Sequence, residues 1–552
     1  MHRQETLNAY ILQSLRSNWE LLALTDFNGA SYQYKDVARK ITKLHILFKN
    51  SGVEKGDKIA ICGRNSAQWA MAFIGIITYG AVAVPVLNEF KPDNIHHLVN
   101  HSGARLLFAD ASTWENLDAA IMPALEGALL ISDFSLLMSR SESLSEARAN
   151  LNKFFGDAYP ERFTVDDVEV SVNRPDDVAL INYTSGSTGF SKGVMVTNRN
   201  LWSNLEYTVD HLDFLSPGDG IVCMLPLAHM YGLLVEMLHP FIKGCHINFL
   251  TRTPSPRIIM EAFANVRPKL IVAVPLILEK IIRTKVFPLL EKPYMKLLLH
   301  VPFVDDRLLA KIKTKLTDSF GGNLVEIIIG GAALNKDVES FLRRIDFPFT
   351  VGYGMTECAP LISYAPHGEA RAGSCGKVVD RMEVRVESPD AAEVPGVLWV
   401  RGDNVMKGYY KNDEATAEVF DADGWMCTGD IGCVDADNFI YLRGRDKNMI
   451  LGPSGQNIYP EEIEQKLNNM PYVGESIVID EGGRLVALVY PDMDNVMQQR
   501  LSAVDIERLM SENMTSLNKE LPGYSQIARI DIMSEEFEKT PKRSIKRYLY
   551  QR

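Results

Sequence analysis

The sequence predicts an α/β fold, with a large multi-subdomain N-terminal part that contains mixed parallel sheets and a small α+β C-terminal lid domain. At 552 residues the chain is too long to form one compact core, so two or more domains are expected. Strand-like apolar runs alternate with helical patterns over most of the length. Near the C-terminus a shorter unit combines a helix with a pair of adjacent strands. We therefore place the N-terminal domain at residues 1–446 and the lid domain at 447–552.

The elements of the N-terminal part follow from local patterns. A short apolar run bounded by turn residues predicts a buried strand, whereas apolar residues three and four positions apart predict a helix. These criteria give strands at 58–63, 81–86, 178–183 and 324–329, and helices at 65–79, 200–212 and 335–345. Strands that alternate with helices in this way are typical of α/β architecture.

The pattern changes from about residue 384 onwards. Short alternating runs, such as Val397–Arg401 and Phe439–Leu442, predict antiparallel strands. The lid domain is expected to contain a helix at 460–469, a strand pair at 475–479 and 484–490, and a later helix at 504–519. The turn Glu481-Gly482-Gly483 connects the two strands of the pair.

Composition and charge restrict the class of protein. The chain is 46% hydrophobic and 23% charged, as is usual for a soluble globular protein. Its formal net charge of -12 argues against a general nucleic-acid binder, so we expect no nucleic-acid partner. The seven cysteines form no C-x-x-C pair, and the first residues lack the apolar core of a signal peptide. With no run of about 18 apolar residues, the sequence predicts a cytoplasmic protein.

The strongest signal for chemistry is the segment Tyr183–Gly193, YTSGSTGFSKG, which directly follows a predicted strand. Its glycines allow a ligand to approach the backbone, while its hydroxyls and its one cation can contact phosphate oxygens. The groups concerned are Thr184, Ser185, Gly186, Ser187, Thr188, Gly189, Lys192 and Gly193. The segment does not match the G-x-x-x-x-G-K-[ST] phosphate loop, because glycine follows Lys192 and the spacing differs. Its composition nevertheless predicts a phosphate-binding loop.

Further segments place reactive or recognition side chains at predicted strand ends and turns. In Gly352–Glu357, GYGMTE, an aromatic ring, a hydroxyl and a carboxylate project from one tight turn. The others are WMCTGD at 425–430, GGAA at 330–333 and PLAHMYG at 226–232. A carboxylate can accept hydrogen bonds from ribose hydroxyls or bind a hard cation. His96, His97 and His101 are expected to form only a polar helix face, since the glutamate of an H-E-x-x-H motif is missing.

These segments, together with YLRGRDKNMI at 441–450 and GQNIYP at 455–460, follow the order found in the adenylate-forming superfamily. The chain resembles this superfamily from about Lys58 to its C-terminus. Its members include acyl-CoA synthetases, the adenylation domains of peptide synthetases and firefly-type luciferases. The resemblance implies binding of ATP, Mg²⁺ and coenzyme A. It also implies that a carboxylic acid is activated as its acyl-adenylate, with release of pyrophosphate, before the acyl group passes to a thiol.

The resemblance implies roles for individual residues. Thr184 to Gly189 and Lys192 would bind the phosphates, while Thr184 and Glu357 would hold Mg²⁺. For the nucleotide, Tyr353 would stack on the adenine, Thr356 would contact the α-phosphate, and Asp430 and Arg445 would contact the ribose. Gly331 would border the adenine and acyl pockets, and His229 would lie beside the acid carboxylate. Lys447 would be the hinge for rotation of the lid.

The sequence departs from the superfamily pattern near its C-terminus. The superfamily carries a catalytic lysine in a string close to T-x-x-G-K-I, and aligning Thr540 and Ile545 with this string puts Ser544 at the lysine position. A cation is needed there, because charge builds up between the acid carboxylate and the α-phosphate in the transition state. We expect Lys542 to supply it, with Lys546 as the alternative. A chain impaired in adenylation is the remaining alternative.

The acid is expected to be a medium- or long-chain fatty acid. The overall pattern, with PLAHMYG and the K-T-P-x-x-S-I-K-R ending, most resembles long-chain acyl-CoA synthetases. A transient membrane contact is compatible with such a substrate. Three alternatives remain open: a fatty acyl-AMP ligase that loads an acyl carrier protein, a stand-alone aryl or amino-acid adenylating enzyme, and a nucleotide-binding pseudoenzyme.

Overall fold

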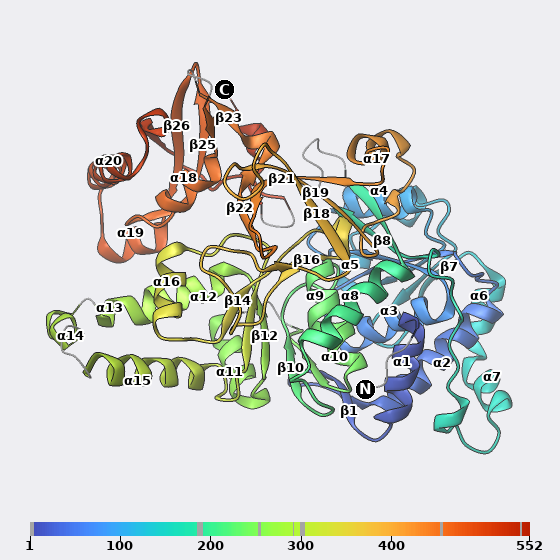
Figure 1. The fold of residues 1–552 in the computed structure, drawn as a ribbon. Coiled ribbons are helices and arrows are strands. Elements are labelled where there is room, and N and C mark those ends of the chain that lie inside the picture. Colours follow the sequence, from blue (N-terminus) through green and yellow to red (C-terminus); the bar gives the residue numbers. More distant parts are fainter. Residues whose placement is uncertain are drawn as a thin grey trace.

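The computed structural model describes residues 5–184, 191–251, 255–290, 292–298, 304–452, 456–540 and 544–551, and Figure 1 shows their helices and strands. The chain forms a large N-terminal part of mixed α/β structure and a small C-terminal domain, drawn in orange to red at the upper left of Figure 1. This architecture confirms the predicted fold class. Within the described ranges, no helix is long and apolar enough to cross a membrane.

The largest sheet has eight strands in the order β20-β9-β8-β4-β3-β5-β6-β7. Its five central strands run parallel, while β9 and β7 are antiparallel to β8 and β6. The bounds are β3 Lys58–Cys62, β4 Val82–Val86, β5 Leu106–Ala109, β6 Gly127–Leu130, β7 Leu136–Ser139, β8 Val178–Thr184, β9 Lys192–Thr197 and β20 Gly408–Tyr409. Because parallel strands end at the same edge, the loops that follow them meet along that edge.

Helices cover both faces of this sheet. On one face α2 (Tyr34–Asn50) packs against α3 (Ala67–Tyr79), which is apolar around its whole circumference because it is buried on all sides. On the other face α4 (Pro92–Ser102) buries its apolar side chains in a separate cluster with β3 to β5. The prediction that three histidines of α4 form one polar face is wrong for His96, which is buried and accepts the Asp118 N–H at 2.9 Å.

Two smaller parallel arrays lie beside the large sheet. One has the order β10-β11-β1-β2, in which only β2 is antiparallel, and the other has the order β12-β13-β14. Their bounds are β1 Leu22–Asp26, β2 Ser31–Gln33, β10 Gly220–Cys223, β11 His246–Phe249, β12 Leu270–Ala273, β13 Glu326–Ile329 and β14 Phe349–Val351. The strands β10 and β12 contact each other, so the two arrays are neighbours.

The other helices lie around these sheets and in the C-terminal domain (Figure 1). Their bounds are α1 Leu7–Ser17, α5 Ala111–Trp114, α6 Glu142–Ala149, α7 Leu151–Ala158, α8 Asn198–His211, α9 Met230–Gly232, α10 His239–Ile242, α11 Pro256–Val266, α12 Pro275–Ile281, α13 Phe287–Leu290, α14 Pro293–Leu298, α15 Val304–Ser319, α16 Lys336–Arg344, α17 Asp413–Val419, α18 Pro460–Leu467, α19 Met493–Gln499 and α20 Ala503–Glu520. The predicted helices at 65–79, 200–212 and 335–345 correspond to α3, α8 and α16, with ends that differ by one or two residues.

Antiparallel structure follows in the chain, as the alternating runs predicted. A four-stranded sheet has the order β18-β19-β21-β22, and a smaller one has the order β15-β16-β17. The bounds are β15 Tyr353–Gly354, β16 Leu361–Tyr364, β17 Lys377–Val378, β18 Met382–Glu387, β19 Gly396–Gly402, β21 Met426–Val434 and β22 Ile440–Arg445. In the β21–β22 pair, Asp430 stands directly opposite Arg445.

The small C-terminal domain has its own apolar core. A three-stranded sheet, β25-β26-β27, packs against α18 and α20 around residues such as Leu467, Val489 and Leu517. The strand bounds are β23 Ile450–Leu451, β24 Asn457–Ile458, β25 Val473–Glu481, β26 Arg484–Pro491 and β27 Ile527–Ile532. The predicted helix and strand pair are therefore present, while the domain division at residue 446 stays a prediction.

The C-terminal tail is attached to this domain through a buried ion pair. The guanidinium of Arg547 contacts the carboxylate of Glu464 in α18, and the Val478 N–H donates to the same carboxylate at 2.6 Å. Burial raises the pKa of Glu464 to about 7, although Arg547 acts to lower it. Because the folded-state pKa lies above the ordinary value, ionisation of this carboxyl reduces stability as pH rises from about 4.5 to about 7.

Replacement of Arg547 by alanine is expected to destabilise the small domain by about 3 kcal/mol at about pH 8, because it leaves a buried carboxylate without its cation. At about pH 5, where Glu464 is protonated in the folded protein, the loss should be much smaller. Thermal midpoints of the full chain at both pH values measure the difference. Arg529→Ala is the control, since its ion pairs with Glu481 and Asp531 are exposed and contribute little to stability. An equal loss at both pH values contradicts the prediction.

Candidate active site

The predicted phosphate loop begins where β8 ends, at the carboxyl edge of the eight-stranded sheet. Thr184 ends β8 and Lys192 begins β9, and the two stand opposite each other, with Thr184 Oγ1 3.5 Å from the Lys192 carbonyl oxygen. The predicted loop residues Ser185, Gly186, Ser187, Thr188 and Gly189 lie outside the described residues. The structure thus describes the two arms on either side of the loop.

Lys192, Tyr409 and Glu357 form a chain of contacts beside these arms. The short strand β20 pairs with β9 and places the Tyr409 ring under the Lys192 ammonium, 4.8 Å from the ring centre. The Tyr409 hydroxyl donates a hydrogen bond to Glu357 Oε1 at 3.0 Å. A cation, a hydroxyl and a carboxylate therefore meet next to the arms of the loop.

The turn that carries Thr356 and Glu357 is anchored from two sides. It is a 3₁₀ turn, Thr356–Cys358, and the Met406 N–H donates to the Glu357 carbonyl oxygen at 2.7 Å. From α8, the buried Asn204 donates to the carbonyl of Cys358 at 3.1 Å. These bonds fix the backbone of the turn before any ligand arrives, as preorganised binding requires, and the Tyr409 hydroxyl contacts the Glu357 carboxylate itself.

A second cluster joins Tyr353, Asp430 and Arg445. The Tyr353 hydroxyl donates to Asp430 Oδ2, and Arg445 Nε lies 2.7 Å from Asp430 Oδ1. Asp430 and Tyr353 are buried, whereas 55% of the Arg445 side chain is exposed. The charge of the Asp430 carboxylate is thus compensated by Arg445, and the exposed Arg445 side chain leaves one side of the cluster open to solvent.

Electrostatics link this cluster to Glu357. Burial raises the pKa of Asp430, while Arg445 and the Tyr353 hydroxyl act to lower it and the charge of Glu357 raises it further. Burial, followed by the charge of Asp430, raises the pKa of Tyr353 well above its ordinary value, so the phenol stays protonated as a donor. The two clusters therefore lie close enough to influence each other and form one site.

The structure brings the strand-end glycines next to the predicted acyl segment. Gly331 has a φ of 85°, a backbone conformation that favours glycine, directly after β13. At Gly330 a Cβ would lie 3.0 Å from the ring of Tyr231, whose hydroxyl donates to the Ile328 carbonyl at 3.0 Å. His229 is half-buried two residues before Tyr231. Because Tyr231 contacts the start of GGAA, the segments GGAA and PLAHMYG lie side by side and form one wall of the site.

The hinge and tail residues are placed as follows. Lys447 is exposed and lies in a 3₁₀ turn, Asp446–Asn448, directly after β22. Ser544 is exposed, and its N–H lies 3.3 Å from Thr540 Oγ1. The Lys546 ammonium is paired with Glu538. Lys542, the favoured catalytic cation, lies outside the described residues.

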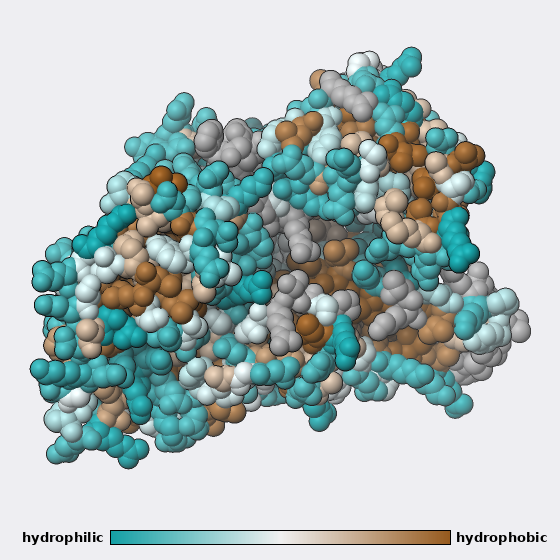
Figure 2. All heavy atoms as spheres, turned by 180° about the vertical axis from the view of Figure 1, so that it is seen from behind, coloured by the Kyte–Doolittle hydropathy of each residue, from teal (hydrophilic) through white to brown (hydrophobic). Residues whose placement is uncertain are grey.

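The C-terminal domain touches the wall of the site in this arrangement. From α18, the Gln465 side chain donates to the Leu334 carbonyl at 2.8 Å, immediately after GGAA. Arg283 donates to the side chain of Asn469 just beyond the same helix. Figure 2, seen from behind, shows that the surface is hollowed beside this domain and that apolar side chains are exposed in the hollow. A rotation at Lys447 would have to break these contacts.

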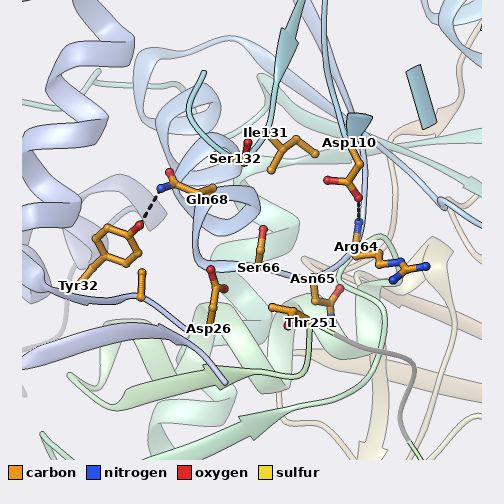
Figure 3. Close-up of a pocket in the computed structure, with 11 residues that line it drawn as sticks. Asp26, Tyr32, Arg64, Asn65, Ser66, Gln68, Asp110, Ile131, Ser132 and Thr251 are labelled. Carbon is orange, nitrogen blue, oxygen red and sulfur yellow. Dashed lines mark hydrogen bonds between the residues drawn. The ribbon is translucent and has the colours of Figure 1, made fainter. Parts of the chain in front are cut away.

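A cavity of about 460 Å³ lies where β3 and β5 of the eight-stranded sheet and β1 of the neighbouring sheet end (Figure 3). Asp26, Ser66, Gln68 and Asp110 are among its lining residues. Asn65, also in the lining, donates to the Leu225 carbonyl at 2.7 Å and accepts the Leu227 N–H at 2.9 Å. The cavity is thereby connected to the loop that carries His229.

The sequence analysis missed Tyr409. The residue lies in the run VMKGYYKN, where a glycine before two tyrosines is only a weak signal for an edge strand. Its role becomes visible only when β20 pairs with β9, more than 200 positions earlier in the chain. Among the predicted nucleotide residues, Lys192 and Glu357 are joined through Tyr409, and Tyr353, Asp430 and Arg445 form the second cluster.

The residues present fit ATP and Mg²⁺. The Glu357 carboxylate and the Thr184 hydroxyl are oxygen donors of the kind that Mg²⁺ prefers, and Lys192 supplies positive charge for phosphate oxygens. Asp430 is a carboxylate acceptor of the kind that binds ribose hydroxyls in other nucleotide folds. The fold and site together define a nucleotide-binding α/β enzyme with a small C-terminal domain.

Comparison with known families identifies this enzyme class. Residues 13–410 match the family model described as AMP-binding enzyme, and residues 447–552 match the AMP-binding enzyme C-terminal domain. The chain therefore belongs to the family of AMP-binding enzymes. The superfamily predicted from the sequence is confirmed.

Individual relatives are similar at moderate identity. A long-chain-fatty-acid–CoA ligase, FadD15 of Mycobacterium bovis, is 28% identical over 78% of this chain and 72% of its own length. A 4-coumarate–CoA ligase 2 of Nicotiana tabacum is 30% identical over 82% and 78%. The solved structure of ATP-bound MatB from Rhodopseudomonas palustris has the same fold, with a TM-score of 0.76, 22% identity and coverage of 99% and 98%.

Replacement of Tyr409 by phenylalanine is expected to raise the KM for MgATP about tenfold, because Glu357 loses a hydroxyl donor while the ring under Lys192 remains. Pyrophosphate release at varied MgATP measures the change. Tyr441→Phe is the matched control, since its hydroxyl binds Asp435 outside the site. An unchanged KM in the Tyr409 variant would show that this bond does not support the Glu357 carboxylate in MgATP binding.

Proposed function

We propose that the protein is an AMP-forming acid–CoA ligase that activates a medium- or long-chain fatty acid as its acyl-adenylate and transfers the acyl group to coenzyme A. The observation that carries the proposal is the union of two clusters in one site, Lys192–Tyr409–Glu357 and Tyr353–Asp430–Arg445. A cation and a carboxylate suit a polyphosphate with its metal ion, and the second carboxylate suits a ribose.

In the first half-reaction, a carboxylate oxygen of the acid attacks the α-phosphorus of ATP and pyrophosphate leaves. Lys192 and the hydroxyls of the loop bind the leaving phosphates, and Thr356 contacts the α-phosphate. Glu357 and Thr184 would hold Mg²⁺, which neutralises phosphate charge when bound. Tyr409 keeps the Glu357 carboxylate oriented toward the phosphates.

The nucleoside and the acid occupy opposite sides of the GGAA segment. Tyr353 stacks on the adenine, and Asp430 with Arg445 binds the ribose hydroxyls. Gly331 allows close approach of the adenine, and His229 stands beside the acid carboxylate. The bonds from Tyr353 and Arg445 to Asp430 orient this carboxylate, so that AMP is held in place while the acyl group reacts.

In the second half-reaction, the lid domain rotates about Lys447 and opens a path for coenzyme A. The thiol attacks the acyl carbonyl, the bond to the phosphate breaks, and AMP leaves. Hinge motion at this position is supported by its location in an exposed turn that directly follows the last strand of the large part. The contacts of Gln465 and Arg283 would be exchanged during the rotation.

The identity of the acid is the finer part of the proposal. Relatives named as long-chain-fatty-acid–CoA ligases and as 4-coumarate–CoA ligases are similar to the same degree, so they support acid–CoA ligation in general. The preference for a fatty acid rests on PLAHMYG and on the C-terminal string. An enzyme of this kind working in the cytoplasm would take its acid from membranes through transient contact.

The test uses purified full-length protein with MgATP, coenzyme A and a panel of acids from acetate to oleate, with 4-coumarate included. Pyrophosphate release reports adenylation, and mass spectrometry of acyl-CoA reports transfer. Oleoyl-CoA formation at a higher kcat/KM than for short or aryl acids is the expected result. Preference for 4-coumarate overturns the fatty-acid assignment, and acyl-AMP without acyl-CoA favours a ligase that loads a carrier protein. No adenylate with any acid favours a pseudoenzyme.

A further inference from the structure

His101 lies against the two arms that flank the phosphate loop. It is the last but one residue of α4, and its Nδ1 lies 2.8 Å from the hydroxyl oxygen of Tyr183, which directly precedes Thr184 in β8. The same imidazole meets the rings of Tyr183 and Tyr410 edge-on, at centroid distances of 5.7 and 5.8 Å. One side chain from a helix thus contacts two tyrosines from separate strand segments.

Tyr410 connects His101 to the second arm. Its backbone N–H donates to the carbonyl of Gly193 at 2.7 Å, directly after the site lysine, and it follows Tyr409 in the chain. The next residue, Lys411, donates from its ammonium to the His101 carbonyl at 2.9 Å. Displacement of the imidazole would therefore affect β8 on one side and the β9–β20 pair on the other.

We propose that His101 is a positioning residue for ATP, which supports the paired β8 and β9 arms of the phosphate loop from one side by bonding Tyr183 and packing against Tyr410. The inference rests on the proposed function, because it assumes that this loop binds ATP phosphates. A role in general stability would weaken ATP and acid use alike. A positioning role acts on ATP alone, since the contacts lie at the phosphate end of the site.

The surroundings of the imidazole keep both His101 and Tyr183 uncharged at neutral pH. Burial, together with the nearby charges of His97 and Lys411, lowers the pKa of His101, so the ring is neutral at neutral pH. Burial raises the pKa of the Tyr183 hydroxyl, so both partners are neutral and share one hydrogen bond at Nδ1, whose donor is set by the imidazole tautomer. The titratable and charged groups around the pair are Tyr183, Tyr410, His97, Lys411 and Lys58, whose ammonium lies 6.0 Å from the Tyr410 ring centre.

A double-mutant cycle tests the proposal. His101→Phe keeps an aromatic ring against the tyrosines but removes the hydrogen-bonding nitrogen, and Tyr183→Phe removes the hydroxyl. Each change should raise the Kd for MgATP by about three- to tenfold, and the double variant should lose no more than either single one. The KM for the acid and kcat at saturating ATP should change by less than about twofold. His101→Gln, whose amide oxygen can accept from Tyr183, should recover part of the affinity.

Calorimetric titration with MgATP in the absence of acid separates the outcomes. Asn94→Ala is the control, because it changes an exposed residue about two turns earlier on α4 and should leave the Kd unchanged. Additive losses in the cycle, or equal losses for ATP and acid, overturn the positioning role. If the parent binds MgATP and the His101 variants bind equally well, only this inference fails. If the parent binds no MgATP, the proposed function fails as well.

Discussion

Replacing Lys542 with alanine is expected to reduce pyrophosphate release by about 10²–10³-fold while transfer from preformed acyl-AMP to coenzyme A continues. The first half-reaction needs a cation between the acid carboxylate and the α-phosphate, and Ser544 at the superfamily position carries none. Lys546 is paired with Glu538; the hydrogen bond between them lowers the pKa of the Glu538 carboxyl, raises the pKa of the Lys546 ammonium and holds this ammonium on the tail itself. This pairing favours Lys542 as the source of the charge.

The comparison variants make this expectation specific. Lys546→Ala should retain adenylation within about threefold, because its ion pair is on the surface and contributes little. If Lys542 already supplies the cation, Ser544→Lys should leave the activity of the parent unchanged. If the tail runs as in the superfamily, so that residue 544 reaches the active site, Ser544→Lys should restore activity to the Lys542→Ala variant. Loss of adenylation in Lys546→Ala, with Lys542→Ala active, would move the role to Lys546. Equal activity in all variants would mean that no tail lysine takes part.

The order of the helices and strands could be predicted because buried segments have a recognisable pattern of apolar residues. The run KIAICG has apolar residues on both faces, as a strand covered by α3 and α4 must have, and it became β3. Helix ends were less certain, since the first residues of α3 and α8 depend on the capping bonds of Ser66 and Thr197. The edge strand β20 was missed because two residues carry no periodicity.

The site was predictable where a motif is local, and it was not where distant segments meet. Thr356 and Glu357 share one turn, so their motif could be read directly. The bonds from Tyr409 to Glu357 and from His101 to Tyr183 join residues 52 and 82 positions apart. Likewise, the predicted polar face of α4 was wrong for His96, because only the packed structure shows that Asp118 covers this side chain.

Replacing Asp430 with asparagine is expected to lower kcat/KM for ATP by about 100-fold, because the two charge-assisted hydrogen bonds that we propose between Asp430 and ribose would together supply about 3 kcal/mol. The change keeps the shape of the side chain and leaves an amide oxygen for Tyr353 or Arg445. Since much of the Arg445 side chain is exposed, its charge stays hydrated and the fold should persist. Steady-state kinetics with varied ATP, at saturating acid and coenzyme A, measure the loss.

The pH dependence provides an independent check on the same carboxylate. Burial raises the pKa of Asp430, so in the parent the ribose acceptor is protonated and lost at less acidic pH than an ordinary aspartate would be. The kcat/KM for ATP should therefore fall on the acid side in the parent, and this fall should be weaker in the asparagine variant. Asp435→Asn is the matched control, because Asp435 follows the same strand but pairs with Arg371 away from the site. If both variants lose ATP use equally, the defect comes from the β21–β22 hairpin and not from ribose binding.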